Sequence, residues 1–147
     1  MIDADTTGWT LAATSSNTSF FEVEPGIVAV VPGKGTLDTR ATALENTTIL
    51  NALWEKLGRG GVIVVFFDRM AGQDADARRI YKSQSHPTLF RGTAFVGGTL
   101  MGRAIGSFFL GINRPAFPVK LFGSVDEALS WARRRNQEVE AHAIERR

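Results

Sequence analysis

The sequence has no cysteine and no long apolar run. The absence of cysteine among its 147 residues excludes a disulfide framework and thiolate chemistry. The longest uninterrupted apolar run, residues 62–67, has six residues, whereas a transmembrane helix needs about twenty. The amino terminus opens with acidic residues and does not have the plan of a secretory signal. We therefore expect a cytoplasmic protein.

An excess of charge of one sign is also missing. The formal net charge of +2 is too small to indicate a nucleic-acid partner. Hydrophobic residues make up 44% and charged residues 22% of the chain, which is the balance of a soluble globular protein. The length fits one domain with a single core.

The pattern of apolar segments predicts an α/β fold, with a mixed sheet of about five strands and about four flanking helices. An opening β-hairpin is expected because Pro25 and Gly26 separate two strand-like runs. The predicted strands cover residues 19–24, 26–32, 60–68, 91–98 and 118–123. The predicted helices cover residues 37–58, about 74–85, 99–114 and 124–140.

We predict a polar arm at residues 1–18, a domain at 19–135 and a charged helix end or tail at 136–147. Trp9 and Leu11 are the expected anchors of the arm, either as an added strand or across a subunit boundary. A homodimer is therefore one of the expected states.

Two helices have specific predicted features. In the first, spacing places five apolar residues on one side and Gly58 marks the end. Those five residues are Leu37, Ala41, Leu44, Leu53 and Leu57. In the last, Ser124 and Glu127 form a predicted capping box. Its expected inward stripe is Val125, Ala128, Leu129 and Ala132.

Known catalytic motifs do not fit the chain. A phosphoacceptor at Asp68 would need further acids near the first strand to hold magnesium, and a phosphatase of the haloacid type would need an acid where Met70 stands. The loop at 32–36 and the pair Gly97–Gly98 lack the spacing of a P-loop or a dinucleotide site. His86 and His142 have no second ligand at metal spacing. We expect no enzyme activity, no metal and no cofactor.

The acidic residues after the apolar strand have a structural interpretation. Asp74 or Asp76 is expected to cap the helix that follows, since either can accept from backbone amides two or three residues on. Asp68 is expected to end the strand and to pair with Arg78 or Arg79.

The element order, the acidic turn and the ending "FPVKLFGSVDEALSWARRR" resemble the STAS superfamily, in particular its SpoIIAA-like branch, over about residues 19–135. The resemblance implies a small mixed sheet flanked by helices, without enzyme activity. Anti-sigma-factor antagonists of this superfamily bind a kinase through the turn after the central strand and the next helix, and phosphorylation of a serine there switches them. That serine would fall at or beside Ala75, and no Ser or Thr occurs at 68–82.

The resemblance supports a first hypothesis, a regulatory module that binds a protein partner without the usual phosphoserine switch. The expected contact residues lie in the turn and the following helix. They are Asp68, Met70, Asp74, Asp76, Arg78, Arg79 and Tyr81.

The second hypothesis is a module that binds a lipid or another hydrophobic ligand, or that associates with a membrane surface. Relatives in the SpoIIAA-like branch are similar to CRAL-TRIO lipid carriers, and the helix predicted at 99–114 is apolar around too much of its circumference for one inward face. The residues proposed for this contact are Leu100, Met101, Arg103, Ile105, Phe108 and Phe109.

Overall fold

The computed structural model describes residues 1–86, 89–98 and 117–145, with the side chains of the last helix described to Glu138. The main sheet has six strands in the order β1-β2-β3-β5-β7-β8. The first three are antiparallel, and β3, β5, β7 and β8 are parallel. These strands are β1 (Thr10–Thr14), β2 (Thr18–Glu24), β3 (Ile27–Pro32), β5 (Gly61–Phe66), β7 (Phe90–Val96) and β8 (Val119–Phe122).

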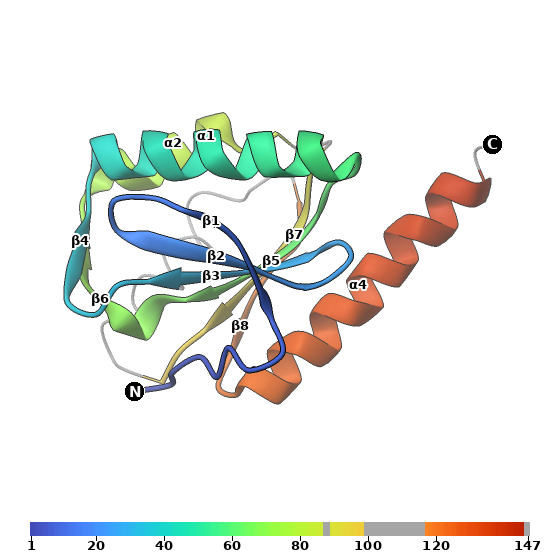
Figure 1. Cartoon of the computed structure of the whole chain (residues 1–147), viewed down its shortest axis with the longest axis horizontal. Helices are drawn as coiled ribbons and strands as arrows, with labels where there is room; N and C mark the ends of the chain where they lie inside the picture. The colour runs from blue at the N-terminus through green and yellow to red at the C-terminus, as the bar shows by residue number, and fades with distance from the viewer. Residues whose placement is uncertain (87–88, 99–116, 146–147) are drawn as a thin grey trace.

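A separate two-stranded ribbon pairs β4 (Thr36–Asp38) with β6 (Met70–Gln73) in parallel. Each of its strands follows closely on the carboxyl end of a strand of the main sheet. Figure 1 shows the ribbon at the end of the molecule opposite the carboxyl end of the last helix.

The helices cover both faces of the main sheet. α1 (Arg40–Leu57) and α2 (Ala75–Gln84) lie together on one face and α4 (Val125–Glu145) crosses the other (Figure 1). α2 packs against α1 through Ala43, Ala77 and Ile80. The mixed sheet with an opening hairpin and flanking helices confirms the predicted fold class, with one strand more than expected.

The central strand, β5, shows why both faces of the main sheet need to be covered by helices. β5 is almost wholly apolar, lies between β3 and β7 and has its side chains buried on both faces, as expected for a parallel strand. On the α1 face Trp54 packs edge-on against Phe90, with ring centroids 6.2 Å apart. On the α4 face the buried helix residues are Ala128 and Ala132, whose small side chains let the helix approach the sheet closely.

α1 ends as predicted, but it begins at Arg40 and not at residue 37, and its buried face differs from the prediction. Thr39 caps the start and Gly58 ends the helix in the left-handed conformation, with φ of 72°, which glycine adopts without a steric cost. Of the predicted stripe only Leu53 is buried, because Leu37 lies in β4 and Ala41, Leu44 and Leu57 are exposed. The face that is buried consists of Ala43, Asn46, Thr47, Leu50, Leu53 and Trp54.

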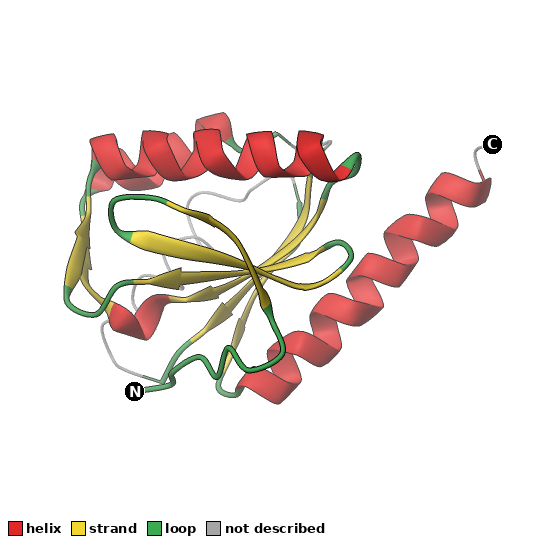
Figure 2. Ribbon diagram, viewed as in Figure 1, coloured by secondary structure: helices red, strands yellow, loops and turns green. Residues whose placement is uncertain are grey.

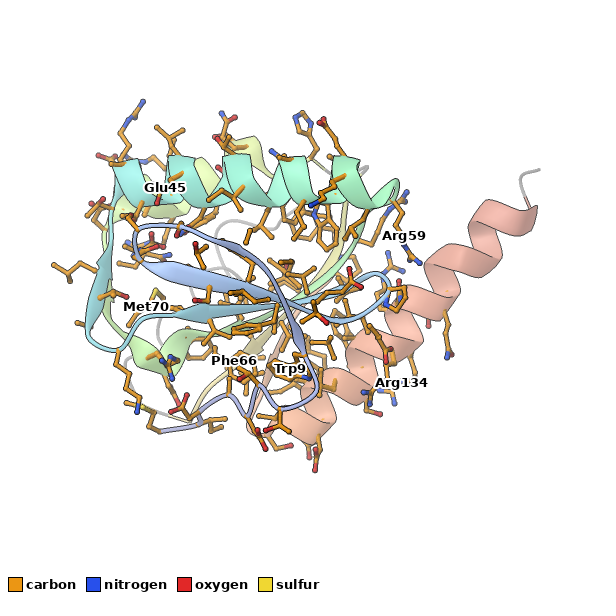
Figure 3. All side chains as sticks on the ribbon, in the orientation of Figure 1. Trp9, Glu45, Arg59, Phe66, Met70 and Arg134 are labelled. Atoms are coloured by element: carbon orange, nitrogen blue, oxygen red, sulfur yellow. The ribbon has the colours of Figure 1, made fainter. Side chains whose placement is uncertain are left out.

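The predicted arm contributes an edge strand. β1 pairs with β2, so the sheet begins before the predicted hairpin. Trp9 is an anchor, as predicted, because its ring lies 6.3 Å from that of Phe21 and 6.1 Å from that of Phe66 (Figure 3). Leu11 lies in the added strand β1, which is one of the two expected alternatives, and its side chain is 55% exposed. Trp9 covers the sheet over β2 and β5, and Leu11 stands farther out on the edge strand.

The last helix has the predicted inward stripe. Ala128 and Ala132 are fully buried, with Val125 and Leu129 packed beside them. The Ser124 hydroxyl accepts from the backbone N–H of Glu127 at 3.2 Å, as in the predicted cap. Asn136 is also buried, which the sequence did not predict. Its amide donates to the Pro25 carbonyl at 2.9 Å and anchors α4 to the β2–β3 turn.

Candidate docking surface

The turn after the central strand is held from inside by Asp68. This residue lies in η1 (Phe67–Arg69), a single turn of 3₁₀ helix, and is 6% exposed. Its Oδ2 atom accepts from the backbone N–H groups of Ile2 and Gly98, both at 2.8 Å. A side chain at Gly97 would collide with the Phe67 ring, so glycine is required there for the close approach. Asp68 therefore joins three segments of the chain and faces inward.

The β4–β6 ribbon presents apolar side chains outward. Leu37 is 63% exposed and its Cδ2 atom lies over Gly72, which has no side chain to cover it. In the adjacent strand Ala71 is exposed and Met70 partly exposed. Figure 3 shows Met70 at the ribbon end of the molecule. The ribbon thus carries Leu37 as a well-exposed apolar side chain beyond the main sheet.

The start of α2 adds charged side chains beside the ribbon. Asp74 is the N-cap and accepts from the Ala77 backbone N–H at 2.8 Å, so the predicted cap is confirmed. Asp76 pairs with Arg79 at 2.8 Å, and these side chains are 54% and 77% exposed. Arg78 turns back to donate to the Gln73 carbonyl at 3.1 Å. The exposed charges are therefore Asp74, Asp76 and Arg79.

A buried polar network fixes the ribbon and α2 to the rest of the fold. Asp38 is 3% exposed and accepts from Thr42 at 2.6 Å and from Gln73 at 3.0 Å. The Tyr81 hydroxyl is hydrogen-bonded to Asp38 and accepts from the Asn46 amide at 3.2 Å. The network therefore links β4, α1, β6 and α2.

The network also changes the acidity of Tyr81. Burial raises the pKa of this phenol above its ordinary value, and the neighbouring Asp38 carboxylate raises it further, while the hydrogen bond from Asn46 acts in the opposite direction. A phenolate would have to form beside a carboxylate in a place that water reaches poorly. Tyr81 is thus a neutral structural group at physiological pH.

The structure brings the seven predicted contact residues to one region but not to one surface. Met70, Asp74, Asp76 and Arg79 have outward-facing atoms, whereas the other three are held by internal bonds. Those three are Asp68, Arg78 and Tyr81. The sequence analysis missed Leu37, which it assigned to a helix. A signal was available, because Thr39 can cap a helix and so places Leu37 before its start. We define the docking surface as Leu37, Met70, Ala71, Asp74, Asp76 and Arg79.

Comparison with known families gives a match over residues 56–136 to a domain of unknown function, DUF7793. This match covers more than half of the chain. The chain belongs to the DUF7793 family. The matched residues begin in the last turn of α1 and continue through β5, β6, α2 and β7 into α4, so the DUF7793 match includes most of the docking surface but not Leu37.

Among solved structures, the chain is similar to an uncharacterized protein of the DUF3478 family with a SpoIIAA-like fold from Shewanella loihica PV-4. The identity is 14%, the similarity covers 84% of this chain and 94% of that one, and the TM-score is 0.49. No curated protein matches the chain.

The hydrophobic-ligand hypothesis concerns a different part of the DUF7793 chain. Its six residues all fall within 99–116, outside the residues that the structure describes, so the hypothesis stays a prediction. In the described ranges, no helix is long and apolar enough to cross a membrane. The same ranges contain no cluster of three or more His, Cys, Asp or Glu side chains that could hold a metal ion.

Proposed function

We propose that this chain is a non-catalytic module that binds a protein partner through the docking surface. The observation that carries the proposal is the exposed Leu37 side chain on a ribbon rimmed by the charges of Asp74, Asp76 and Arg79. An apolar centre with a polar, charged rim is the usual arrangement of protein–protein interfaces. Scattered exposed leucines are common on protein surfaces, but here the apolar atoms of Met70 and Ala71 lie on the same ribbon.

The rigidity of the ribbon supports the proposal. Its two strands are short, yet Asp38 of β4 accepts from Thr42 of α1 at 2.6 Å and from Gln73 of β6 at 3.0 Å, and the Gln73 carbonyl accepts from Arg78 of α2 at 3.1 Å. A surface that is already ordered loses less conformational entropy when a partner binds. The docking surface is therefore preorganised by the network beneath it.

The charges of the surface indicate how docking is controlled. Residues 68–82 contain no Ser or Thr that could be phosphorylated, and Asp74 and Asp76 carry their negative charge permanently. Phosphorylation acts by adding charge of this kind. We therefore propose constitutive docking, or control from another part of the chain.

The test is quantitative capture of partners from a lysate of the native organism, with the immobilised chain as bait. We expect Leu37→Asp and Arg79→Glu each to reduce capture of a specific protein at least tenfold, which corresponds to about 1.4 kcal/mol of binding free energy. The matched control is Lys56→Glu, which reverses an exposed charge in the last turn of α1 and should leave capture unchanged. Equal capture by all four proteins would refute the docking surface. Arg79 is a better probe than Arg78, whose guanidinium bonds to the Gln73 carbonyl.

A further inference from the structure

A polar hollow lies at the carboxyl end of β3, beside the β4–β6 ribbon, and is lined by side chains other than those of the docking surface. It has a volume of about 540 Å³ and is open to solvent. Its walls come from the β1–β2 turn, the end of β3, Arg69 and the amino-terminal segment. Seven hydroxyl-bearing residues line it, namely Thr6, Thr14, Ser15, Ser16, Thr18, Ser19 and Thr36. In open α/β sheets, ligands bind outside the carboxyl ends of the strands.

Arg69 lines this hollow, and together with Lys34, which follows the lining residue Gly33, it already holds an anion, the carboxylate of Asp3. One oxygen of Asp3 pairs with the Arg69 guanidinium, and the other lies 3.4 Å from Lys34 Nζ. These contacts and the hydrogen bond from the Ala4 backbone N–H lower the pKa of Asp3, with the Ala4 bond as the largest cause. The carboxylate thus stands where an external anion would be bound.

Arg69 is positioned independently of Asp3. Its Nε donates to the Pro32 carbonyl at 2.5 Å and its side chain is only 18% exposed. Its own carbonyl accepts from the Gly35 backbone N–H at 2.8 Å. A guanidinium fixed in this way remains directed at the anion position when Asp3 leaves, and its planar fork suits phosphate oxygens.

The segment that carries Asp3 lies at the amino terminus of the chain, before the first strand. We define residues 1–6 as the strap, which Figure 2 shows as an extended loop before β1. Its polar attachments besides those of Asp3 include the bond from the Ile2 backbone N–H to Asp68, and Ile2 and Ala4 pack against the core beneath. The Asp3 side chain itself is 42% exposed, so an external anion can reach its position.

We propose that Arg69 and Lys34 form a binding site for the phosphate group of a small polar molecule, and that Asp3 is its internal competitor. The hydroxyl-lined hollow accommodates the rest of that molecule. Binding displaces the Asp3 carboxylate and loosens the strap. This site uses other side chains than the docking surface, and its test measures phosphate binding, so a negative result would leave the proposed function untouched.

The experiment is a titration with inorganic phosphate at constant ionic strength, with chloride as the balancing salt, followed by amide NMR. The reporters are the amides of Gly35 and Thr36 beside the cations and that of Ile2 in the strap. Asp3→Asn removes the competing charge with little change of shape. If the site is free of Asp3 about a tenth of the time, this variant should bind phosphate about tenfold more tightly than the unmodified chain.

Three further variants make the result decisive. Arg69→Gln should abolish saturable binding, and Lys34→Gln, at a side chain that is 65% exposed, should weaken it without risk to the fold. Lys56→Gln removes one positive charge elsewhere and should bind as the unmodified chain does. The proposal is overturned if Asp3→Asn shows no saturable binding, or if Lys34→Gln and Lys56→Gln bind alike.

Discussion

Asp68 and Asp74 are close in sequence, yet the first is buried beneath the amino-terminal strap and the second is exposed at the start of α2. At Asp68 the carboxylate is enclosed by backbone N–H groups from residues far away in the chain. The Asp74 carboxylate instead accepts from the backbone N–H of Ala77 in the helix that it caps. The comparison teaches that an acidic turn after a central strand contains two regions. One is closed by the chain itself, and the other is left open to a partner.

The largest effect on stability is expected at the closed region. Asp68→Ala leaves the N–H groups of Ile2 and Gly98 without their acceptor and should lower the free energy of unfolding by about 3 kcal/mol. Chemical denaturation measures this difference. Glu55→Ala, at an exposed position of α1, is the control and should change stability by less than about 0.5 kcal/mol. Equal effects of the two variants would show that Asp68 does not hold the turn.

The next effect concerns the network beneath the docking surface. Tyr81→Phe removes the hydroxyl that Asn46 and Asp38 contact and should cost about 1–2 kcal/mol at neutral pH. The pKa of Tyr81 is raised in the fold from its ordinary value of 10.0. The contribution of this group to stability is therefore complete below pH 10 and declines as the pH rises above it, because only the unfolded chain releases the proton readily.

The pH dependence has a direct optical measurement, since Tyr81 is the only tyrosine of the chain. Tyrosinate absorbance should stay absent above pH 10 until the protein unfolds. The stability of the unmodified chain should fall more steeply there than that of Tyr81→Phe. Titration of the native phenol near pH 10 would show that the network does not bury Tyr81.

The smallest effect is expected at the open region. Asp74→Ala removes the N-cap of α2 and should cost about 1 kcal/mol, whereas Asp74→Asn keeps an acceptor and should cost much less. Asp76→Ala breaks only the exposed pair with Arg79 and should cost less than about 0.5 kcal/mol. Thermal unfolding of the three variants measures the order of their costs in stability. A cost at Asp76 equal to that at Asp74 would contradict the cap assignment.

The strands β2, β3, β5, β7 and β8 and the helices α2 and α4 could be predicted from the sequence because their signals are local. Residues 62–67 form a continuous apolar run, and Asp74 and Ser124 stand where caps are needed. The partners of Asp68 could not be predicted, since Ile2 and Gly98 lie 66 and 30 residues away. No local pattern encodes such contacts.

Part of the docking surface could not be predicted, because the local signals there are weak. Strands of three and four residues, such as β4 and β6, are too short to show an alternating pattern. The face of α1 was misassigned because Asn46 and Thr47 are buried with hydrogen-bond partners, while the apolar side chains of Leu44 and Leu57 are exposed. A rule that places apolar residues inside fails where a polar network replaces part of the core.

The most direct test of the docking surface is site-specific photo-crosslinking in cells of the native organism. A photoreactive amino acid is introduced in place of Leu37 on the ribbon and, in a second protein, in place of Lys56 on α1. We predict one discrete cross-linked protein at the first position, lost when Arg79→Glu is added, and none at the second. The same pattern at both positions, or no cross-link at position 37, would contradict the account.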